Sequence, residues 1–428
     1  MRREFRYRSL VANLLLILVG LFGAFTANAK ESPGNSFEEN SVISWTASPQ
    51  KKWEEGWVLP TRIPSQVRDT TIHQVLRLSL GGESLRLAFS NKYGEETVNL
   101  ESVTVREYRS DVARQTNSFV SVEFDGKNGV AIAPGTKVVS DPVEFSAPDR
   151  GQVLVSIYLE ENTDLSTFHW DGRQTAFYSS GDTTEASTVS SDSTNTARVL
   201  LSEVWAKSNH RGAIGIIGNS ITDGNGASLN SDSRWPDFLA QELVSNRVAV
   251  FNAGISGNRL LKPGMGDSAL VRFEDDVLNM PGVHTAIVLI GINDISWPKT
   301  PFAPRSSLPK KSELIDGYRK LIAMGHRRGI RMIGGTLLPF QGALKGTEFE
   351  SYYSPEKDHL RRAINQWIRS SGAFDEVVDF ARILHDPGDP GVLADEFDSG
   401  DNLHPGDAGN EKMADALLKV LKVSTKDE

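Results

Sequence analysis

The chain has 428 residues, a length typical of two domains or one large domain. It contains no cysteine, which excludes a thiol nucleophile, a cysteine-ligated zinc ion and a lipoprotein attachment site. The formal net charge of −9 argues against nucleic acid or an anionic membrane surface as a partner, and it is compatible with a neutral substrate such as an acylated sugar.

The first 29 residues have the pattern of a secretory signal peptide. Four arginines precede an apolar run over residues 10–25, and Ala27-Asn28-Ala29 fits the small-x-small rule for cleavage. We therefore expect a secreted or periplasmic protein that begins at Lys30. Its net charge would be −12, because four arginines and one glutamate are removed. The alternative is an uncleaved anchor, but the run is short for a membrane span of about 20 residues. No second run of that length follows, so we expect no membrane partner after cleavage.

Residues from about 40 to 182 are predicted to form β structure, because apolar and polar side chains alternate along short runs between turns. The clearest runs cover residues 74–80, 84–89 and 153–159. Short strands of this kind favour a sandwich, so we predict an all-β, jelly-roll-like sandwich domain over residues 30–205. A stretch rich in Ser and Thr, residues 183–196, is either a linker or a long surface loop near its end.

From Ala213 onward, strand and helix patterns alternate, which predicts an α/β domain with a parallel sheet covered by helices on both faces. The expected strands cover residues 213–217, 248–252, 285–290, 331–337 and 377–380. The expected helices cover residues 235–244, 269–278, 313–328, 357–370 and 408–421. We assign this domain to residues 206–428 and expect its ligand site at the carboxyl ends of the strands.

Two glycine-containing motifs follow the first two of these strands. Residues 218–224 place Ser220 in a turn between a strand and a helix, where a hydroxyl can be exposed to a substrate. Taken alone, a loop serine that caps the helix is the commoner structure. Residues 252–258 include Gly257, whose backbone N–H can approach an oxyanion closely, although an ordinary glycine-rich turn also explains this piece.

Two further motifs carry an amide and a carboxylate–histidine pair. Residues 291–294 put the Asn293 amide at a strand end, where it can donate to an oxyanion; the alternative is an Asx turn or a cap. We expect Asp294 to orient this loop. Residues 401–406 set Asp401 three residues before His404. A carboxylate beside a histidine holds one imidazole tautomer and leaves the other nitrogen free to take a serine proton. The alternative is a helix-entry loop with a surface histidine.

Together the four motifs occur in an order that resembles the SGNH, or GDSL-like, hydrolase superfamily over about residues 212–421. The residues that match its name are Ser220, Gly257, Asn293 and His404, with Asp401 in its customary place. The resemblance implies a flavodoxin-like three-layer α/β/α fold and ester hydrolysis without a metal or another cofactor. It also implies a catalytic triad of Ser220, His404 and Asp401. The oxyanion hole would consist of the N–H groups of Ser220 and Gly257 and the Asn293 side chain.

The β half followed by this domain resembles an exported bacterial subgroup that is similar to carbohydrate acetylesterases. This resemblance implies removal of acetyl groups from a small-molecule or polysaccharide ester. Residues 167–175 also look like a feature of the subgroup, and they either line the cleft or form a strand and turn of the sandwich. One departure from the family is Asn219, where an aspartate usually precedes the serine. Asn keeps the size and one acceptor but loses the charge, which leaves room for a weakened enzyme.

Other functions fit the sequence less well. The eight histidines form no His-x-x-x-His or His-x-His pair, which argues against a metal site. Asp223 and Asp294 could be imagined as the carboxylates of a glycosidase, but both lie in turns with structural explanations. Two alternatives stay open: a lipolytic or thioester hydrolase on the same scaffold, and a weakened hydrolase that binds glycan. Aromatic residues that either line an acyl pocket or pack in the core are Trp297, Phe302, Phe340 and Tyr352.

Overall fold

The computed structural model describes residues 40–54, 56–109 and 118–424, which belong to one compact unit, Glu38–Glu428. The predicted signal peptide lies outside the described residues. Within the described ranges, no helix combines the length and the apolar character needed to cross a bilayer.

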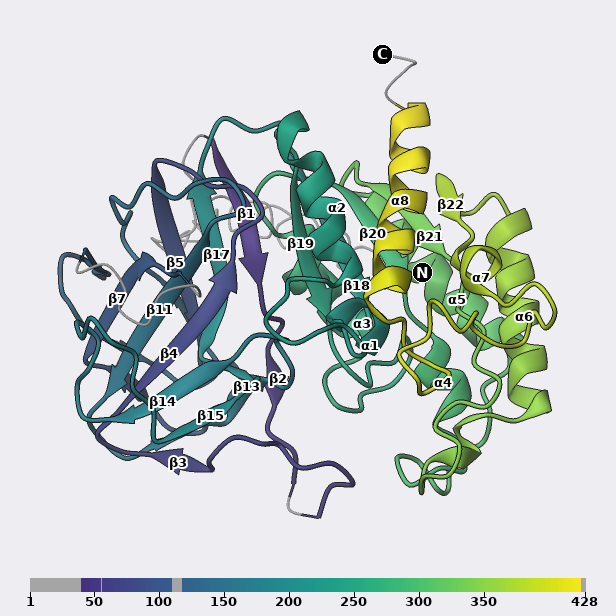
Figure 1. The fold of residues 1–428 in the computed structure, drawn as a ribbon, viewed down its shortest axis with the longest axis horizontal. Coiled ribbons are helices and arrows are strands. Elements are labelled where there is room, and N and C mark those ends of the chain that lie inside the picture. Colours follow the sequence, from purple (N-terminus) through teal and green to yellow (C-terminus); the bar gives the residue numbers. More distant parts are fainter. Residues whose placement is uncertain (1–39, 55, 110–117, 425–428) are drawn as a thin grey trace, which may run out of the picture. The chain divides into compact units, whose positions relative to one another are not determined.

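The first half is built of antiparallel strands, as predicted (Figure 1). One sheet has the order β1-β17-β5-β10 and the other the order β15-β14-β4-β11-β7-β8. Leu87 of the first sheet and Val155 of the second belong to one buried apolar cluster, so the two sheets share a core. The strands of this half are β1 Ser41–Thr46, β2 Gln50–Lys51, β3 Gln66–Val67, β4 Thr70–Arg77, β5 Ser84–Ser90, β6 Val98–Leu100, β7 Ser102–Glu107, β8 Val120–Ser121, β9 Val130–Ile132, β10 Lys137–Val139, β11 Gln152–Leu159, β12 Thr163–Asp164, β13 Thr167–His169, β14 Ala176–Ser180, β15 Ser193–Asn195, β16 Arg198–Val199 and β17 Leu201–Lys207.

Two segments of this half differ in detail from the simplest expectation. The strand predicted at residues 74–80 leaves the ladder with β11 after Arg77, because the next residues cross to the other sheet, where the Ser79 N–H donates to the Ser44 carbonyl at 3.0 Å. The Ser- and Thr-rich stretch 183–196 lies against the six-stranded sheet: β15 pairs with β14, and the Thr184 carbonyl accepts from Arg106 at 2.7 Å. The chain then joins the four-stranded sheet of the same half through β17. A domain boundary at residues 205/206 stays a prediction.

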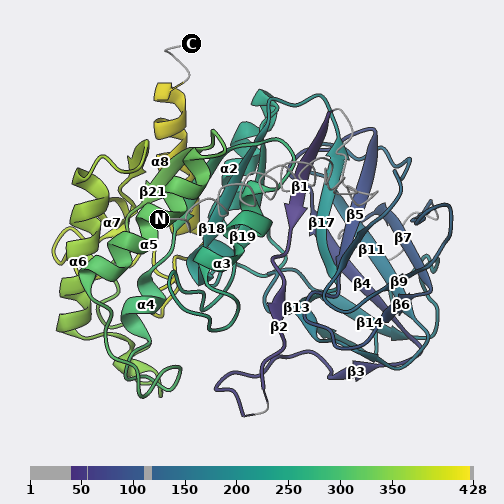
Figure 2. The ribbon, with the colours of Figure 1, turned by 180° about the vertical axis from the view of Figure 1, so that it is seen from behind.

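The second half is a parallel sheet with the order β19-β18-β20-β21-β22 (Figures 1 and 2). Its first strand lies second in the sheet, which is the flavodoxin-like order, so the predicted three-layer α/β/α fold is confirmed. The strands are β18 Ala213–Gly218, β19 Ala249–Gly254, β20 Val283–Leu289, β21 Arg331–Gly335 and β22 Glu376–Val378. The helices are α1 Ser220–Asp223, α2 Trp235–Leu243, η1 Val244–Asn246, α3 Ala269–Phe273, η2 Glu274–Leu278, α4 Ile292–Ser296, α5 Lys311–His326, η3 Glu350–Tyr352, α6 Pro355–Ser370, α7 Phe380–Leu384 and α8 Asp407–Ser424.

Both faces of this sheet are covered by helices. Ile216 and Ile217 are neighbours on β18, yet they belong to different buried clusters, because successive side chains of a strand point to opposite faces. Helices α2 and α8 complete one cluster, and α3, α5 and α6 complete the other. The strand predicted at residues 377–380 ends at Val378, because the Asp379 side chain accepts from the Arg382 N–H and caps α7.

The two halves make direct polar contacts along β1 and β19, which lie side by side in both views (Figures 1 and 2). The Thr46 hydroxyl donates to the Asn252 carbonyl at 2.7 Å, and the Ser79 hydroxyl accepts from the Val250 N–H at 2.7 Å. The edge strand β19 is therefore hydrogen-bonded to the β half at the point where the second of the four motifs begins.

Candidate active site

Ser220 is the first residue of α1, directly after β18. The Asn219 side chain caps this short helix by accepting from the Ile221 N–H at 3.0 Å. Gly224 ends the helix in the left-handed region, at φ 109°, and donates to the Ser220 carbonyl at 2.9 Å. Ser220 thus lies in a tight turn between strand and helix, and the helix offers its N–H no acceptor.

Asn219 fills the position where the family usually has aspartate, and its side chain caps α1. It is fully buried, and its Nδ2 has no hydrogen-bond partner within the described part of the chain. The Asn219 amide therefore supports the turn through its oxygen, while its nitrogen is a buried donor without a partner among the described residues.

The structure brings Ser220, His404 and Asp401 into one hydrogen-bonded series. His404 Nε2 lies 2.9 Å from Ser220 Oγ, and His404 Nδ1 lies 2.6 Å from Asp401 Oδ2. The other Asp401 oxygen accepts the N–H groups of Leu403 at 2.9 Å and His404 at 2.8 Å. Burial alone would raise the pKa of Asp401, but the hydrogen bond and charge of His404 lower it to about 2. An ionised Asp401 holds the proton on Nδ1 and leaves Nε2 free to accept from Ser220.

Two backbone N–H groups near this series have no acceptor among the described residues: those of Ser220 and Gly257. Gly257 has a φ of 69°, and a β-carbon there would overlap Met265 and lie 2.9 Å from Trp297, so only glycine fits. Asn293 Nδ2 donates to the Asn258 carbonyl at 2.9 Å, which ties the third motif to the second and leaves the other amide hydrogen unused.

The loop after Gly257 is held from the third motif. Asp294 accepts the N–H groups of Leu260 at 2.6 Å and Leu261 at 3.0 Å, so it orients the loop as expected. Burial raises the pKa of Asp294 to about 6, although these two hydrogen bonds act in the opposite direction. The third motif thus holds the chain that follows Gly257, at Asn258, Leu260 and Leu261.

Sequence reasoning missed three contacts at this site. Asp223, considered only as a glycosidase carboxylate, accepts from the Ser256 N–H and hydroxyl, both at 2.7 Å. His169 of β13 reaches the other Asp223 oxygen at 2.9 Å. Tyr352, considered as pocket lining, donates its hydroxyl to Asn293 Oδ1. The polar and aromatic residues 167–175 indicated that His169 could lie near the site, but the sequence did not predict that its partner is Asp223.

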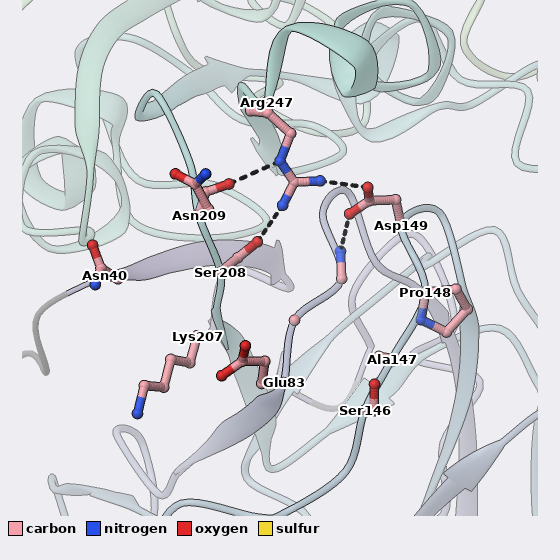
Figure 3. A pocket seen from close by; sticks show the side chains of 12 residues that line it. Asn40, Glu83, Ser146, Ala147, Pro148, Asp149, Lys207, Ser208, Asn209 and Arg247 are labelled. Carbon is pink, nitrogen blue, oxygen red and sulfur yellow. Dashed lines mark hydrogen bonds and ion pairs between the residues drawn. The ribbon is translucent and has the colours of Figure 1, made fainter.

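A cavity of about 620 Å³ lies elsewhere, between segments of the two halves (Figure 3). None of its lining residues belongs to the four motifs. All three guanidinium nitrogens of Arg247 already donate, to Asp149 at 2.5 Å, Asn209 at 2.8 Å and Ser208 at 2.5 Å. We therefore take the ends of the parallel strands, and not this cavity, as the candidate site.

A doubly wound α/β sheet with a hydrogen-bonded serine, histidine and carboxylate at its strand ends is an arrangement typical of serine hydrolases. Residues 216–412 match the model of the GDSL-like Lipase/Acylhydrolase family, so the chain contains a GDSL-like domain over these residues. The predicted resemblance is confirmed. Comparison with curated protein sequences gives no match.

Solved structures of similar proteins match about half of this chain. A GDSL-like lipase from Bacteroides thetaiotaomicron VPI-5482 is 16% identical with a TM-score of 0.38, and the match covers 50% of this chain and 89% of that one. An acetyl xylan esterase, AlAXEase, is 18% identical with a TM-score of 0.37, and the match covers 49% of this chain and 98% of that one.

Proposed function

We propose that the protein is a serine esterase that hydrolyses carboxylic esters through an acyl-enzyme, with Ser220 as nucleophile, His404 as base and Asp401 as its partner. The observation that supports this most directly is the continuous hydrogen-bonded series, 2.6 Å from Asp401 to His404 and 2.9 Å from His404 to Ser220. The ionised Asp401 favours the histidine tautomer that can take the serine proton.

In this mechanism, Ser220 Oγ attacks the ester carbonyl while His404 Nε2 takes its proton. The resulting oxyanion accepts from the N–H groups of Ser220 and Gly257 and from Asn293 Nδ2, and each such donor lowers the barrier by about 3 kcal/mol. His404 then gives the proton to the leaving alcohol. Water attacks the acyl-enzyme with His404 again as base, and the proton returns to Ser220 Oγ.

The proposed substrate is an acetylated carbohydrate. Met265 and Trp297 occupy the space beside Gly257, which favours a short acyl group. Two half-buried tryptophans of the β half, Trp53 and Trp57, extend this row of aromatic rings. The centre of the Trp57 ring lies 6.4 Å from that of Trp297 and 6.0 Å from that of Trp53. Flat aromatic faces of this kind pack against sugar rings, and the acidic net charge suits a neutral substrate.

We also propose that the protein is exported, on the signal-peptide pattern of residues 1–29. The mature chain would begin at Lys30. Amino-terminal sequencing of the exported protein tests this cleavage, and a chain that still carries residues 1–29 would contradict it.

The experiment that tests the activity is hydrolysis of a p-nitrophenyl ester series, from acetyl to long-chain acyl, by the wild type and by Ser220→Ala. We expect hydrolysis confined to short acyl groups and lost in a folded Ser220→Ala variant. Unchanged turnover in that variant would disprove the assignment of the nucleophile. A preference for long chains would favour a lipolytic or thioester hydrolase, and no activity on any ester would favour a glycan-binding protein.

A further inference from the structure

His169 and Asp223 form a buried pair between the two halves of the chain. Their exposed fractions are 5% and 2%, and His169 Nε2 lies 2.9 Å from Asp223 Oδ1. His169 Nδ1 lies 3.1 Å from the Ser48 carbonyl, which can only accept. Asp223 accepts two hydrogen bonds from Ser256 through its other oxygen, and we take it as the acceptor here too, so that both ring nitrogens donate and His169 is an imidazolium.

The arginines near this pair are bonded to other aspartates, so His169 is the basic side chain that hydrogen-bonds Asp223. Arg272, which reaches the Ser48 hydroxyl, pairs with Asp276 at 2.8 Å. Two arginines lie beside Gly224, the residue after Asp223: Arg234, whose pKa the Asp223 charge helps to raise, bonds Asp237 at 2.7 Å, and Arg173 lies 3.4 Å from Asp171. Burial acts to lower the pKa of His169, but the charge and hydrogen bond of Asp223, the Ser48 carbonyl and the charge of Asp171 together raise it.

Asp223 connects this cation to the reacting centre. It lies on α1, three residues after the proposed nucleophile, and its second oxygen accepts both the N–H and the hydroxyl of Ser256 at 2.7 Å. Ser256 is joined by one peptide bond to Gly257, whose N–H is a proposed oxyanion donor. One carboxylate thus links the nucleophile helix, the oxyanion loop and the β half.

We propose that His169 is a positioning residue for the esterase reaction: its imidazolium holds the Asp223 carboxylate, which holds Ser256 and aims the Gly257 N–H at the oxyanion. This inference rests on the proposed function. It makes the β half part of the catalytic apparatus. Because an oxyanion donor acts mainly in the transition state, loss of this alignment should lower kcat and leave KM nearly unchanged.

The test is kinetics of His169→Gln on p-nitrophenyl acetate. We expect kcat to fall about 10- to 100-fold with KM within about 2-fold of wild type, because the oxyanion donor is misaligned. The matched control is His326→Gln, since His326 also pairs with an aspartate, Asp375, at 2.9 Å, but on the surface. A wild-type kcat in His169→Gln, or an equal loss in His326→Gln, would overturn the proposal.

A paired variant separates positioning from a general packing role. In His169→Gln with Asp223→Asn, the new side chains can hydrogen-bond each other while Asn still accepts from Ser256, so no buried charge is left unpaired. We expect this double variant to recover at least about 5-fold in kcat over His169→Gln, as neighbours in one network are not additive. A loss in the double variant equal to or larger than that in His169→Gln would count against the proposal.

Folding and the proposed function are checked separately. If circular dichroism shows that His169→Gln does not fold, Asp223→Ala takes its place, because it removes the buried negative charge together with the acceptor for Ser256. Its kcat should fall at least about 10-fold, and an unchanged kcat would overturn the proposal. A wild type that hydrolyses no ester would end both proposals, whereas activity that needs Ser220 but is indifferent to His169 would end only this one.

Discussion

The hydroxyl of Tyr352 should set the orientation of the Asn293 amide, and Tyr352→Phe tests this. Tyr352 is 3% exposed in η3, and its ring packs edge-on against Phe340 at 6.3 Å. Burial raises the pKa of Tyr352 well above its usual value, so the hydroxyl stays a donor at any working pH. It donates to Asn293 Oδ1, and Asn293 Nδ2 donates to the Asn258 carbonyl at 2.9 Å.

The expected losses of stability and of kcat in Tyr352→Phe follow from these two hydrogen bonds. Without the hydroxyl, Asn293 Oδ1 is buried and unpaired, which costs about 1–3 kcal/mol in the free energy of unfolding. A flipped amide would present oxygen to the oxyanion, and complete loss of that donor costs about 3 kcal/mol in the barrier. The Asn258 carbonyl still favours the native orientation, so we expect a partial effect: kcat about 10-fold lower, with KM little changed.

The assay is kcat and KM on p-nitrophenyl acetate together with thermal unfolding. Tyr353→Phe is the matched control, because its hydroxyl donates only a long 3.4 Å hydrogen bond, to Gln341. In an Asn293→Ala background, Tyr352→Phe should cause almost no further loss of kcat. A Tyr352→Phe variant that melts earlier but turns over like wild type, or a full additional loss in the Asn293→Ala background, would refute the reasoning.

Two further predictions concern the oxyanion donor and the triad carboxylate. Gly257→Ala should lower kcat at least about 100-fold and reduce the melting temperature, because its β-carbon would overlap Met265 at a φ of 69°; near-normal kinetics would contradict this. Asp401 has a folded pKa of about 2 against a usual 3.8, so its stabilisation is present above pH 3.8 and is lost as the pH falls through 2. In urea titrations, the free energy of unfolding of the wild type should exceed that of Asp401→Asn by about 1–2 kcal/mol at pH 6, with the gap closing by pH 2. A gap that does not change with pH would count against this linkage.

Much of the fold could be predicted because the patterns that specify it are local. Alternating side chains marked β5 and β11, and apolar runs followed by amphipathic segments marked the parallel sheet and its helices. The nucleophile turn and the Asp401–His404 pair are local as well, since each lies within a few residues of chain. Even the strand ends that gather the motifs follow from the general rule for parallel sheets.

Only the tertiary structure decided which distant side chains support these motifs. His169 and Asp223 are separated by 54 positions, and Asn293 and Tyr352 by 59. The periodicity of a sequence predicts that a side chain is buried, but it does not predict which residue that side chain will contact. A buried polar group acquires its hydrogen-bond partner only when separate segments of the chain pack together. For this reason the sequence alone was enough to predict the proposed reacting residues, whereas the packing of the β half against the α/β half decided which side chains hold them in place.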